Sequence, residues 1–380
     1  MTQATRWWVA GIVIALCMAV GILGARVDVV QASDRSGRPR AEKATGAVDA
    51  SIEAEALRKG LSSAGFVDVP ENVVATLSTL EKLDDYPVYT MRYIGPYVLP
   101  SELERASAQG DRQAGNSDWA CSLFAAVADP RRAVFGRNFD WEYSPILVLF
   151  LEPSEGYRSV MSVDIAYLVE PEWINRLDAA PVEELVPLLT APFLTFDGMN
   201  EMGLAVGMAS VDYECGYPSN PDKRDVGDLR LMREMLEASA TVDEAITFLE
   251  TINPVSQGGP NTHYVIADRT SAALIEYHDG EMYVLGSSAK APWQFGTNFP
   301  VILAEGSPGG RCWRYDRIET TLREQVGDLS VAEASDLLHA VSTPMTRWSI
   351  VYDLAKLQMH LTIERDTGTM RMFSIDDGSK

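Results

Sequence analysis

The chain has 380 residues, of which 46% are hydrophobic and 23% charged, so it can bury a large core as one large domain or two smaller ones. Its formal net charge of -22 argues against a nucleic-acid partner, because phosphate binding requires a concentrated basic face. The four His residues lack metal-ligand spacing, and no glycine-rich phosphate-binding motif occurs. We therefore expect no metal and no cofactor.

The N-terminal segment has the pattern of a targeting signal. Arg6 precedes an apolar run at 7–24, and Val30-Gln31-Ala32 resembles a small-residue cleavage site, which predicts a signal peptide over 1–32. The run is also near the lower length limit for spanning a bilayer, so an uncleaved membrane anchor is the alternative. We expect an exported protein that is periplasmic, extracellular or held at the membrane by this segment alone.

Residues 33–120 are expected to form a partly folded N-terminal extension or propeptide. Within it, 61–104 carry a helix-like stretch followed by a strand-like stretch at 87–99. Residues 105–119 are almost entirely polar and predict an exposed, cleavable loop. The main domain is expected over 121–380.

From Cys121 onward, groups of strands alternate with pairs of helices, which argues against a doubly wound parallel sheet. Helical spacing of apolar residues predicts helices at 229–236 and 242–249, with two more near 311–324 and 330–341. The expected strands are 121–128, 133–139, 145–152, 263–268, 272–277, 281–286, 292–297, 347–353, 357–364 and 369–375. The simplest packing of this order is an α+β fold, a four-layer αββα sandwich with two stacked antiparallel sheets.

The first two of these strands carry a thiol, a cation and a carboxylate. Turn-forming residues at 129–132 predict a hairpin that returns Arg137 and Asp140, sixteen and nineteen positions after Cys121, to the side of the thiol. A guanidinium beside a thiol favours the thiolate. The hairpin therefore predicts a self-contained nucleophile.

The other cysteines are too few for a disulfide scaffold. Beyond Cys17 in the N-terminal run, the chain holds Cys121, Cys215 and Cys312, an odd number that leaves at least one thiol free. A bridge between Cys215 and Cys312 is one alternative, and two small buried residues is the interpretation we favour.

Five ordered blocks resemble the choloylglycine hydrolases and penicillin V acylases, which are N-terminal nucleophile (Ntn) hydrolases. They are CSLFAAV followed by FGRNFDWEYS, FDGMNEMGLAVG at 196–207, PNTHYVIAD at 260–268, GTNFP at 296–300 and RYDR at 314–317. The resemblance runs from Cys121 to about residue 365 and implies the Ntn-hydrolase fold, which is the αββα sandwich.

The resemblance also implies a role for each matching residue. Cys121 would be the nucleophile, with its own α-amino group, of unperturbed pKa about 7.7–8.0, as the base. Asp140 would orient and charge-balance the ammonium form, and Arg137 would favour the thiolate. Asn298 would donate its NH₂ group to the oxyanion, which is typically worth roughly 3 kcal/mol, and Arg314 would hold Asp140 or the thiolate in place.

Several further positions are open to two interpretations. The resemblance places Ser210 where the family has an Asn of the oxyanion or substrate site, and Asn200 could take the place of that Asn or could cap a turn before Gly203. Trp141 and Tyr143 could line an apolar acyl pocket or belong to the core. In the last block, Arg311 and Arg317 lie within one helical turn of Arg314 and compete with it for its role.

The position of Cys121 in the chain adds a requirement. Because 120 residues precede it, its α-amino group forms only when the Ala120–Cys121 bond is broken. We expect attack of the Cys121 thiol on the preceding carbonyl, with cleavage by a protease as the alternative. The extension could then stay bound or be lost.

Together these features predict an exported hydrolase that cleaves linear, non-peptide amides through a thioester at Cys121. Its small-molecule substrates would be conjugated bile acids, penicillin V, N-acyl-homoserine lactones or other N-acyl amines or amino acids, which all present an apolar acyl group on an amide. The alternatives are acyl transfer to an amine and a non-catalytic exported binding protein of the same fold. A homo-oligomer is left open.

Overall fold

The computed structural model describes most of the chain after residue 45. The described residues are 46–66, 68–83, 86–97, 120–256, 261–304, 308–366 and 368–379. The expected signal peptide or anchor at 1–32 and the expected loop at 105–119 lie outside them. Within the described ranges, no helix is both long and apolar enough to cross a membrane. Residues 45–380 form one compact unit.

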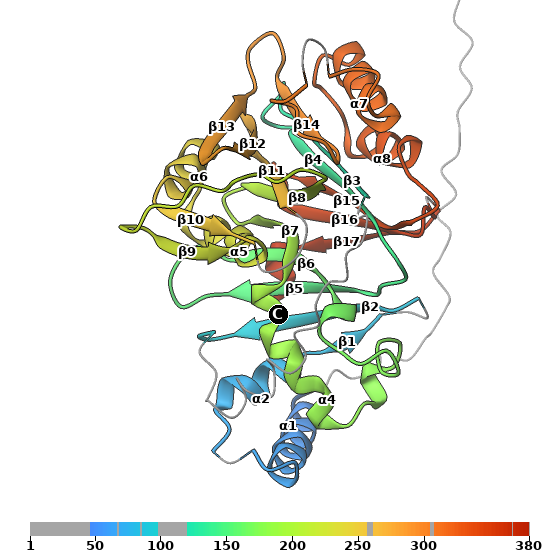
Figure 1. The fold of residues 1–380 in the computed structure, drawn as a ribbon. Coiled ribbons are helices and arrows are strands. Elements are labelled where there is room, and N and C mark those ends of the chain that lie inside the picture. The colour runs from blue at the N-terminus through green and yellow to red at the C-terminus, as the bar shows by residue number, and fades with distance from the viewer. Residues whose placement is uncertain are drawn as a thin grey trace, which may run out of the picture. The chain divides into compact units, whose positions relative to one another are not determined.

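Two sheets form the centre of this unit (Figure 1). The larger has nine strands in the order β1-β2-β5-β6-β7-β8-β11-β12-β13, and the smaller has six in the order β14-β3-β4-β15-β16-β17. The larger sheet comprises β1 (Glu81–Lys82), β2 (Val88–Ile94), β5 (Ile146–Glu152), β6 (Ser159–Asp164), β7 (Thr195–Asn200), β8 (Ala205–Val211), β11 (Asn261–Ala267), β12 (Ala272–His278) and β13 (Glu281–Gly286). The smaller comprises β3 (Ala120–Ala126), β4 (Val134–Asp140), β14 (Trp293–Gly296), β15 (Thr346–Asp353), β16 (Gln358–Ile363) and β17 (Met370–Ser374). A separate parallel pair joins β9 (Arg224–Gly227) and β10 (Ile252–Val255).

Helices cover the outer faces of both sheets. Helix α5 (Asp228–Ala238) packs on β7 of the larger sheet and against α6 (Val242–Leu249). Helices α7 (Trp313–Glu324) and α8 (Val331–Ala340) pack on β14 and β15 of the smaller sheet, and β3 faces β8 between the sheets. The predicted four-layer αββα sandwich and its four helices are confirmed (Figure 1).

The larger sheet differs from the expectation of purely antiparallel strands, because β2 pairs in parallel with β5. A parallel neighbour requires a long connection, and the chain between these two strands includes the whole β3–β4 hairpin of the other sheet. The N-terminal extension thus supplies a strand of the main sheet.

In the uncut chain, the described part of the extension packs with residues 121–380 in one compact unit, and the expected division at residue 120 stays a prediction about the cut chain. Helices α1 (Gly46–Ser63) and α2 (Glu71–Leu77) pack beside α4 (Val182–Leu185) and β2, respectively. Four side chains of β2 are fully buried, namely Val88, Tyr89, Met91 and Tyr93. These elements share the core of residues 121–380.

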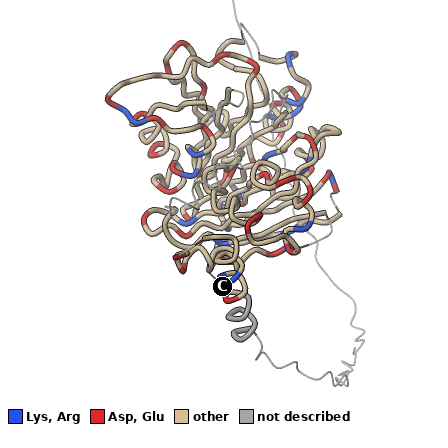
Figure 2. The backbone as a smooth tube through the Cα atoms, turned by 60° about the horizontal axis from the view of Figure 1, so that its bottom comes forward, with Lys and Arg blue, Asp and Glu red and all other residues tan. Residues whose placement is uncertain are grey.

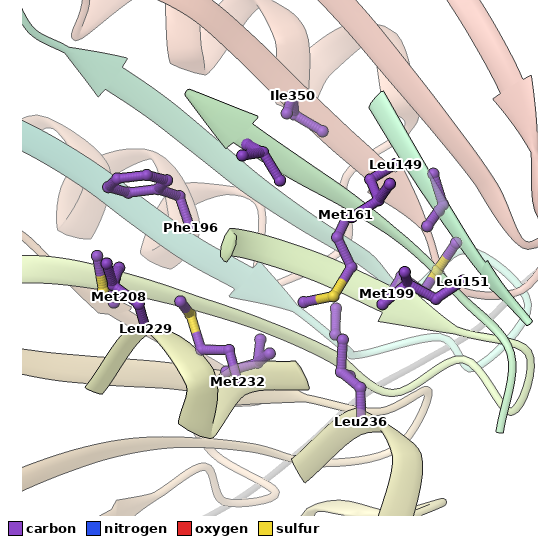
Figure 3. Packing of buried hydrophobic residues seen from close by; sticks show 14 of the residues in the cluster. Leu149, Leu151, Met161, Phe196, Met199, Met208, Leu229, Met232, Leu236 and Ile350 are labelled. Carbon is purple, nitrogen blue, oxygen red and sulfur yellow. The ribbon is translucent and has the colours of Figure 1, made fainter. Parts of the chain in front are cut away.

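Between α5 and the larger sheet, the core is closely packed. Figure 3 shows Met232 and Leu236 of the helix beside Met161 and Met199 of the strands. Gly198 allows this approach, because a Cβ atom there would lie 2.8 Å from Cγ of Met161. Gly198, the first glycine of the FDGMNEMGL block, therefore has a packing role.

Charges are distributed widely over the fold. Figure 2 shows Asp and Glu positions spread along the chain, with fewer Lys and Arg positions interspersed among them. The net charge of -22 is thus shared by many elements rather than carried by one acidic segment. Such a distribution favours solubility.

Candidate active site

The β3–β4 hairpin places the thiol and the guanidinium together. At its turn, the carboxylate of Asp129 accepts a 3.0 Å bond from the backbone N–H of Arg131, which explains why the chain reverses there. The antiparallel register sets Cys121 opposite Phe139. Nη2 of Arg137 lies 3.5 Å from Sγ of Cys121, and both side chains are buried. The predicted proximity of these two residues is confirmed.

A carboxylate that the sequence reasoning missed holds this arginine. Asp197, on β7 of the larger sheet, is fully buried and accepts a hydrogen bond from Nη1 of Arg137. It also accepts bonds from the hydroxyl of Ser162, at 2.6 Å, and from the hydroxyl of Tyr352. The network joins the two sheets beside the thiol. An Asp inside an apolar strand requires such partners. The Asp in the apolar stretch FDGMNEMGL could therefore have indicated a buried ion pair from the sequence.

Two more of the predicted residues contact the backbone of Cys121. Oδ1 of Asn298 accepts a 2.8 Å bond from the backbone N–H of Cys121 and another 2.8 Å bond from Nη2 of Arg314. Nη1 of Arg314 donates to the Cys121 carbonyl oxygen and, at 3.0 Å, to the hydroxyl of Ser122. Arg314 is buried on α7, whereas Arg311 and Arg317 are exposed, so the structure selects Arg314 from the three.

The orientation of the Asn298 amide follows from these contacts. A backbone N–H and a guanidinium only donate, so the atom of Asn298 that faces them is its oxygen. The NH₂ group then points to Ser210, with 2.9 Å to its carbonyl oxygen and 3.0 Å to its hydroxyl. In the uncut chain, Asn298 therefore holds the nitrogen of Cys121 while its NH₂ group bonds Ser210, and its expected donation to an oxyanion stays a prediction. Ser210 therefore lies at the site, where it binds the side chain of Asn298.

Asp140 lies at the end of β4, opposite Ala120 in the strand register. Its Oδ1 accepts a hydrogen bond from Thr346, and its Oδ2 lies 3.9 Å from Nη1 of Arg314. Oδ2 is buried and accepts no hydrogen bond from the described residues. Burial raises the pKa of Asp140, while the Thr346 hydroxyl and Arg314 oppose that rise. This oxygen can accept one more donor.

Burial also governs the thiol itself. It raises the pKa of Cys121 above its ordinary value, and the charge and hydrogen bond of Arg137 oppose the rise without cancelling it. Arg137 thus favours the thiolate, as expected, but burial outweighs this effect on the pKa of Cys121 in the uncut chain. Arg137 stays charged, because Asp197 raises its pKa although burial by itself would lower it.

The other candidate side chains have contacts of their own. Asn200 is buried at the end of β7, where its Oδ1 accepts bonds from the backbone N–H groups of Met202, at 3.1 Å, and Leu204, at 3.0 Å. Its Nδ2 donates 2.7 Å bonds to two backbone carbonyls at 236 and 239. This arrangement supports the turn-capping interpretation of Asn200.

The two candidate aromatic residues have the following contacts. Tyr143 is 41% exposed, and its hydroxyl donates a 2.5 Å bond to Asn175. Trp141 is partly buried against the core, and its backbone carbonyl accepts a 2.8 Å bond from Nε of Arg347. A role of either residue in an acyl pocket stays a prediction.

The described cysteines are all unbridged. Cys121 and Cys215 are buried and Cys312 is partly exposed, which excludes the Cys215–Cys312 bridge in this structure. Within the described part of the chain, no cluster of three His, Cys, Asp or Glu side chains could hold a metal ion.

Comparison with known proteins identifies a family. Residues 121–291 match the family of linear amide C-N hydrolases, choloylglycine hydrolase family. Solved structures that resemble the chain include a mutant of the conjugated bile acid hydrolase from Clostridium perfringens, at 15% identity over 68% of this chain and 93% of that chain, with a TM-score of 0.48. The penicillin V acylase from Agrobacterium tumefaciens matches at 19% identity over 67% and 85% of the two chains, with a TM-score of 0.44. The Caenorhabditis elegans N-acylethanolamine-hydrolyzing acid amidase ortholog matches at 13% identity over 62% and 93%, with a TM-score of 0.37.

No curated protein matches the chain. The family match begins at the nucleophile candidate and includes the residues that surround it on β4, β7 and β8. Residues 121–291 therefore belong to the choloylglycine hydrolase family, and the protein is a hydrolase that acts on the C–N bonds of linear amides.

Proposed function

We propose that the protein is an exported amidohydrolase that cleaves linear, non-peptide amides through a thioester on Cys121. The observation that carries this proposal is that three polar side chains bind three atoms of one residue. Arg137 contacts the sulfur of Cys121, Asn298 its nitrogen and Arg314 its carbonyl oxygen. A structural cysteine would not require such contacts on its side chain and on both sides of its backbone.

The first step that we propose is cleavage of the chain. The Cys121 thiol attacks the Ala120 carbonyl carbon, the C–N bond breaks, and the nitrogen gains a proton as the acyl group moves to sulfur. Water then hydrolyses the thioester, which leaves a carboxylate on Ala120 and a free amine on Cys121. The bond from Asn298 holds the nitrogen at the place where the amine is formed.

The amine then serves as the base for turnover. It takes the thiol proton, the thiolate attacks the substrate carbonyl, and the leaving amine departs with that proton. Water hydrolyses the thioester and restores the thiol. Arg137 stabilises the thiolate as it forms, and the unoccupied Oδ2 of Asp140 accepts from the ammonium form.

The acyl group that enters is apolar in all the substrates we propose. These are conjugated bile acids, penicillin V, N-acyl-homoserine lactones and other N-acyl amines or amino acids. The family match supports a linear amide in general and does not rank its members.

One experiment tests both steps. We expect wild-type protein from its native host to have a mature chain that begins at Cys121, to react with iodoacetamide at that thiol, and to hydrolyse at least one member of a panel of acyl amides. Cys121→Ala should remain uncut and inactive.

A fully active enzyme with Ala120 still attached would overturn the cleavage step, and unchanged hydrolysis by Cys121→Ala would overturn the assignment of Cys121 as the nucleophile. Wild type that neither turns over nor reacts with the probe would favour the binding protein. An added amine acceptor that collects most of the acyl group would favour acyl transfer.

A further inference from the structure

A buried His–Glu pair lies behind the segment that carries Asn298. His263 is on β11 and Glu276 on the neighbouring strand β12, and each is 1% exposed. Nδ1 of His263 lies 2.9 Å from Oε1 of Glu276. Two ionisable groups without access to water require a compensating function or a complete set of partners.

The partners of this pair are backbone groups on both sides of Asn298. Nε2 of His263 lies 2.6 Å from the carbonyl oxygen of Thr297. The two carboxylate oxygens of Glu276 accept 2.8 Å bonds from the backbone N–H groups of 301–302. The pair thus binds the backbone at Thr297, directly before Asn298, and at 301–302, a few residues after it.

Hydrogen-bond chemistry shows how the pair is protonated. A carbonyl oxygen only accepts, so Nε2 of His263 carries a proton toward Thr297, and a further proton must lie between Nδ1 and Glu276. Burial alone would raise the pKa of Glu276, but the hydrogen bond and charge of His263 and the two backbone N–H groups lower it below its ordinary value. One proton therefore lies along the contact between Nδ1 and Oε1 and joins the two side chains as a hydrogen-bonded pair.

The ring is also fixed by close packing. Gly296 precedes Thr297, and a Cβ atom at this position would lie 3.1 Å from Cε1 and 3.2 Å from Nε2 of His263. Such distances are tighter than most real contacts, so the ring is seated directly against the backbone. A small displacement of the ring would therefore shift the backbone at 296–297 and, with it, the neighbouring Asn298.

We propose that His263 and Glu276 form a hydrogen-bonded pair that positions Asn298, and through it the nitrogen of Cys121. The inference rests on the proposed function of Asn298 and deepens it. Neither residue is assigned to the reacting atoms, and both act as positioning residues. Their effect on rate comes through geometry, and an error of about 1 Å in a reacting group can cost on the order of 100-fold.

The test uses His263→Gln, Glu276→Gln and the double variant in the full chain. The substrate is the acyl amide that wild type hydrolyses fastest, and active sites are counted by iodoacetamide labelling of Cys121. We expect kcat per labelled site to fall roughly 10- to 100-fold with little change in KM. Because the pair acts as one unit, the double variant should lose no more than the worse single variant.

His278→Gln is the matched control. It lies on the same strand as Glu276, its ring contacts the Tyr213 hydroxyl, and it should keep kcat within about twofold. If the Gln variants do not fold, Gly296→Ala tests the same contact. Its added methyl should displace the ring and lower kcat severalfold, with a moderate fall in Tm.

The two proposals fail in different ways. Unchanged kcat in folded, fully labelled His263→Gln and Glu276→Gln would overturn this inference and leave the nucleophile assignment intact. If wild type has no turnover, the proposed function fails, and hydrogen exchange at residues 297–302 then decides the inference. Faster exchange in both variants supports it, and unchanged protection overturns it.

Discussion

The backbone nitrogen of Cys121 donates a 2.8 Å hydrogen bond to Oδ1 of Asn298, a residue 177 positions further along the chain. In the uncut chain this nitrogen has one proton to donate, and as a free amine it would have more. Oδ1 of Asn298 already accepts from this nitrogen, and Oδ2 of Asp140 accepts no hydrogen bond from the described residues, so both could accept from the amine that the proposed cut would form. The site is assembled before the proposed cut.

Removal of the Asn298 side chain should slow the proposed cleavage. In Asn298→Ala, the N–H of Cys121 and Nη2 of Arg314 lose their shared acceptor, and a buried donor without a partner costs about 1–3 kcal/mol. We expect the uncut form to accumulate, with cleavage at least tenfold slower, as followed by mass spectrometry.

The control for this change is Asn138→Ala on β4. Asn138 is more deeply buried than the partly buried Asn298, and its side chain bonds Leu338 and Ser349. It should lower the free energy of unfolding without holding the chain uncut. Equal accumulation of uncut chain in both variants would contradict the role of Asn298.

Asp197→Asn should uncouple Arg137 from the thiol. The change keeps the size of the side chain but removes the charge that balances a fully buried guanidinium, and such an imbalance typically costs about 3–5 kcal/mol. We expect a large loss of stability in urea unfolding and slower alkylation of Cys121.

Ser162→Ala serves as the comparison, because it removes one 2.6 Å bond to the same carboxylate and leaves the ion pair intact. Its cost should be near 1 kcal/mol. If Asp197→Asn is as mild as Ser162→Ala, the carboxylate does not hold Arg137.

The segment before the cut should stay bound after cleavage. Strand β2 lies between β1 and β5, so its loss would expose an unpaired sheet edge and the apolar groups that it covers. We expect the fragment to co-elute with the main chain in native gel filtration and to separate only in denaturant.

Met91→Asp should release this fragment, because Met91 is fully buried and a lone buried carboxylate is costly. Arg92→Ala is the control, since it removes only a half-exposed ion pair with Glu152 at 3.1 Å, which contributes little. A fragment that is absent from native wild-type enzyme would contradict the prediction.

Asp164 should make stability depend on pH. Burial raises its pKa to about 7, although bonds from Ser144 and the backbone N–H of Ala166 oppose this, and its ordinary value is about 3.9. Between these values the folded state holds a proton that the unfolded state lacks, so stability falls as pH rises from about 4 to 7. The total effect is on the order of 4 kcal/mol.

Asp164→Asn removes this dependence. The free energy of unfolding of the variant, relative to wild type, should rise between pH 4 and 7 and then level off. Asp129→Asn is the control, because the pKa of Asp129 is about 2 and its titration lies below this range. A constant difference between Asp164→Asn and wild type would contradict the prediction.

Local pattern was sufficient for much of the fold. The spacing of apolar residues predicted the helices α5 to α8, and turn-forming residues predicted the β3–β4 hairpin. Both signals lie in neighbouring residues, which is why the sequence alone was enough. The strands β6, β7 and β8 were absent from the expected set. Their runs, SVMSVD, TFDGMN and AVGMASV, contain Ser, Asp and Gly that interrupt the apolar signal, and those residues are there for contacts across the sheets.

For the site, the sequence alone predicted that Arg137 lies beside Cys121 in one hairpin and, through ordered blocks, that Asn298 and Arg314 join them. Only the tertiary structure decided that the oxygen of Asn298 faces Cys121, that Asp197 holds Arg137 and that β2 belongs to the main sheet. These three features are contacts between segments far apart in the chain. Hydrogen-bond direction, burial and strand pairing depend on the neighbours that folding brings together, and no local pattern encodes them.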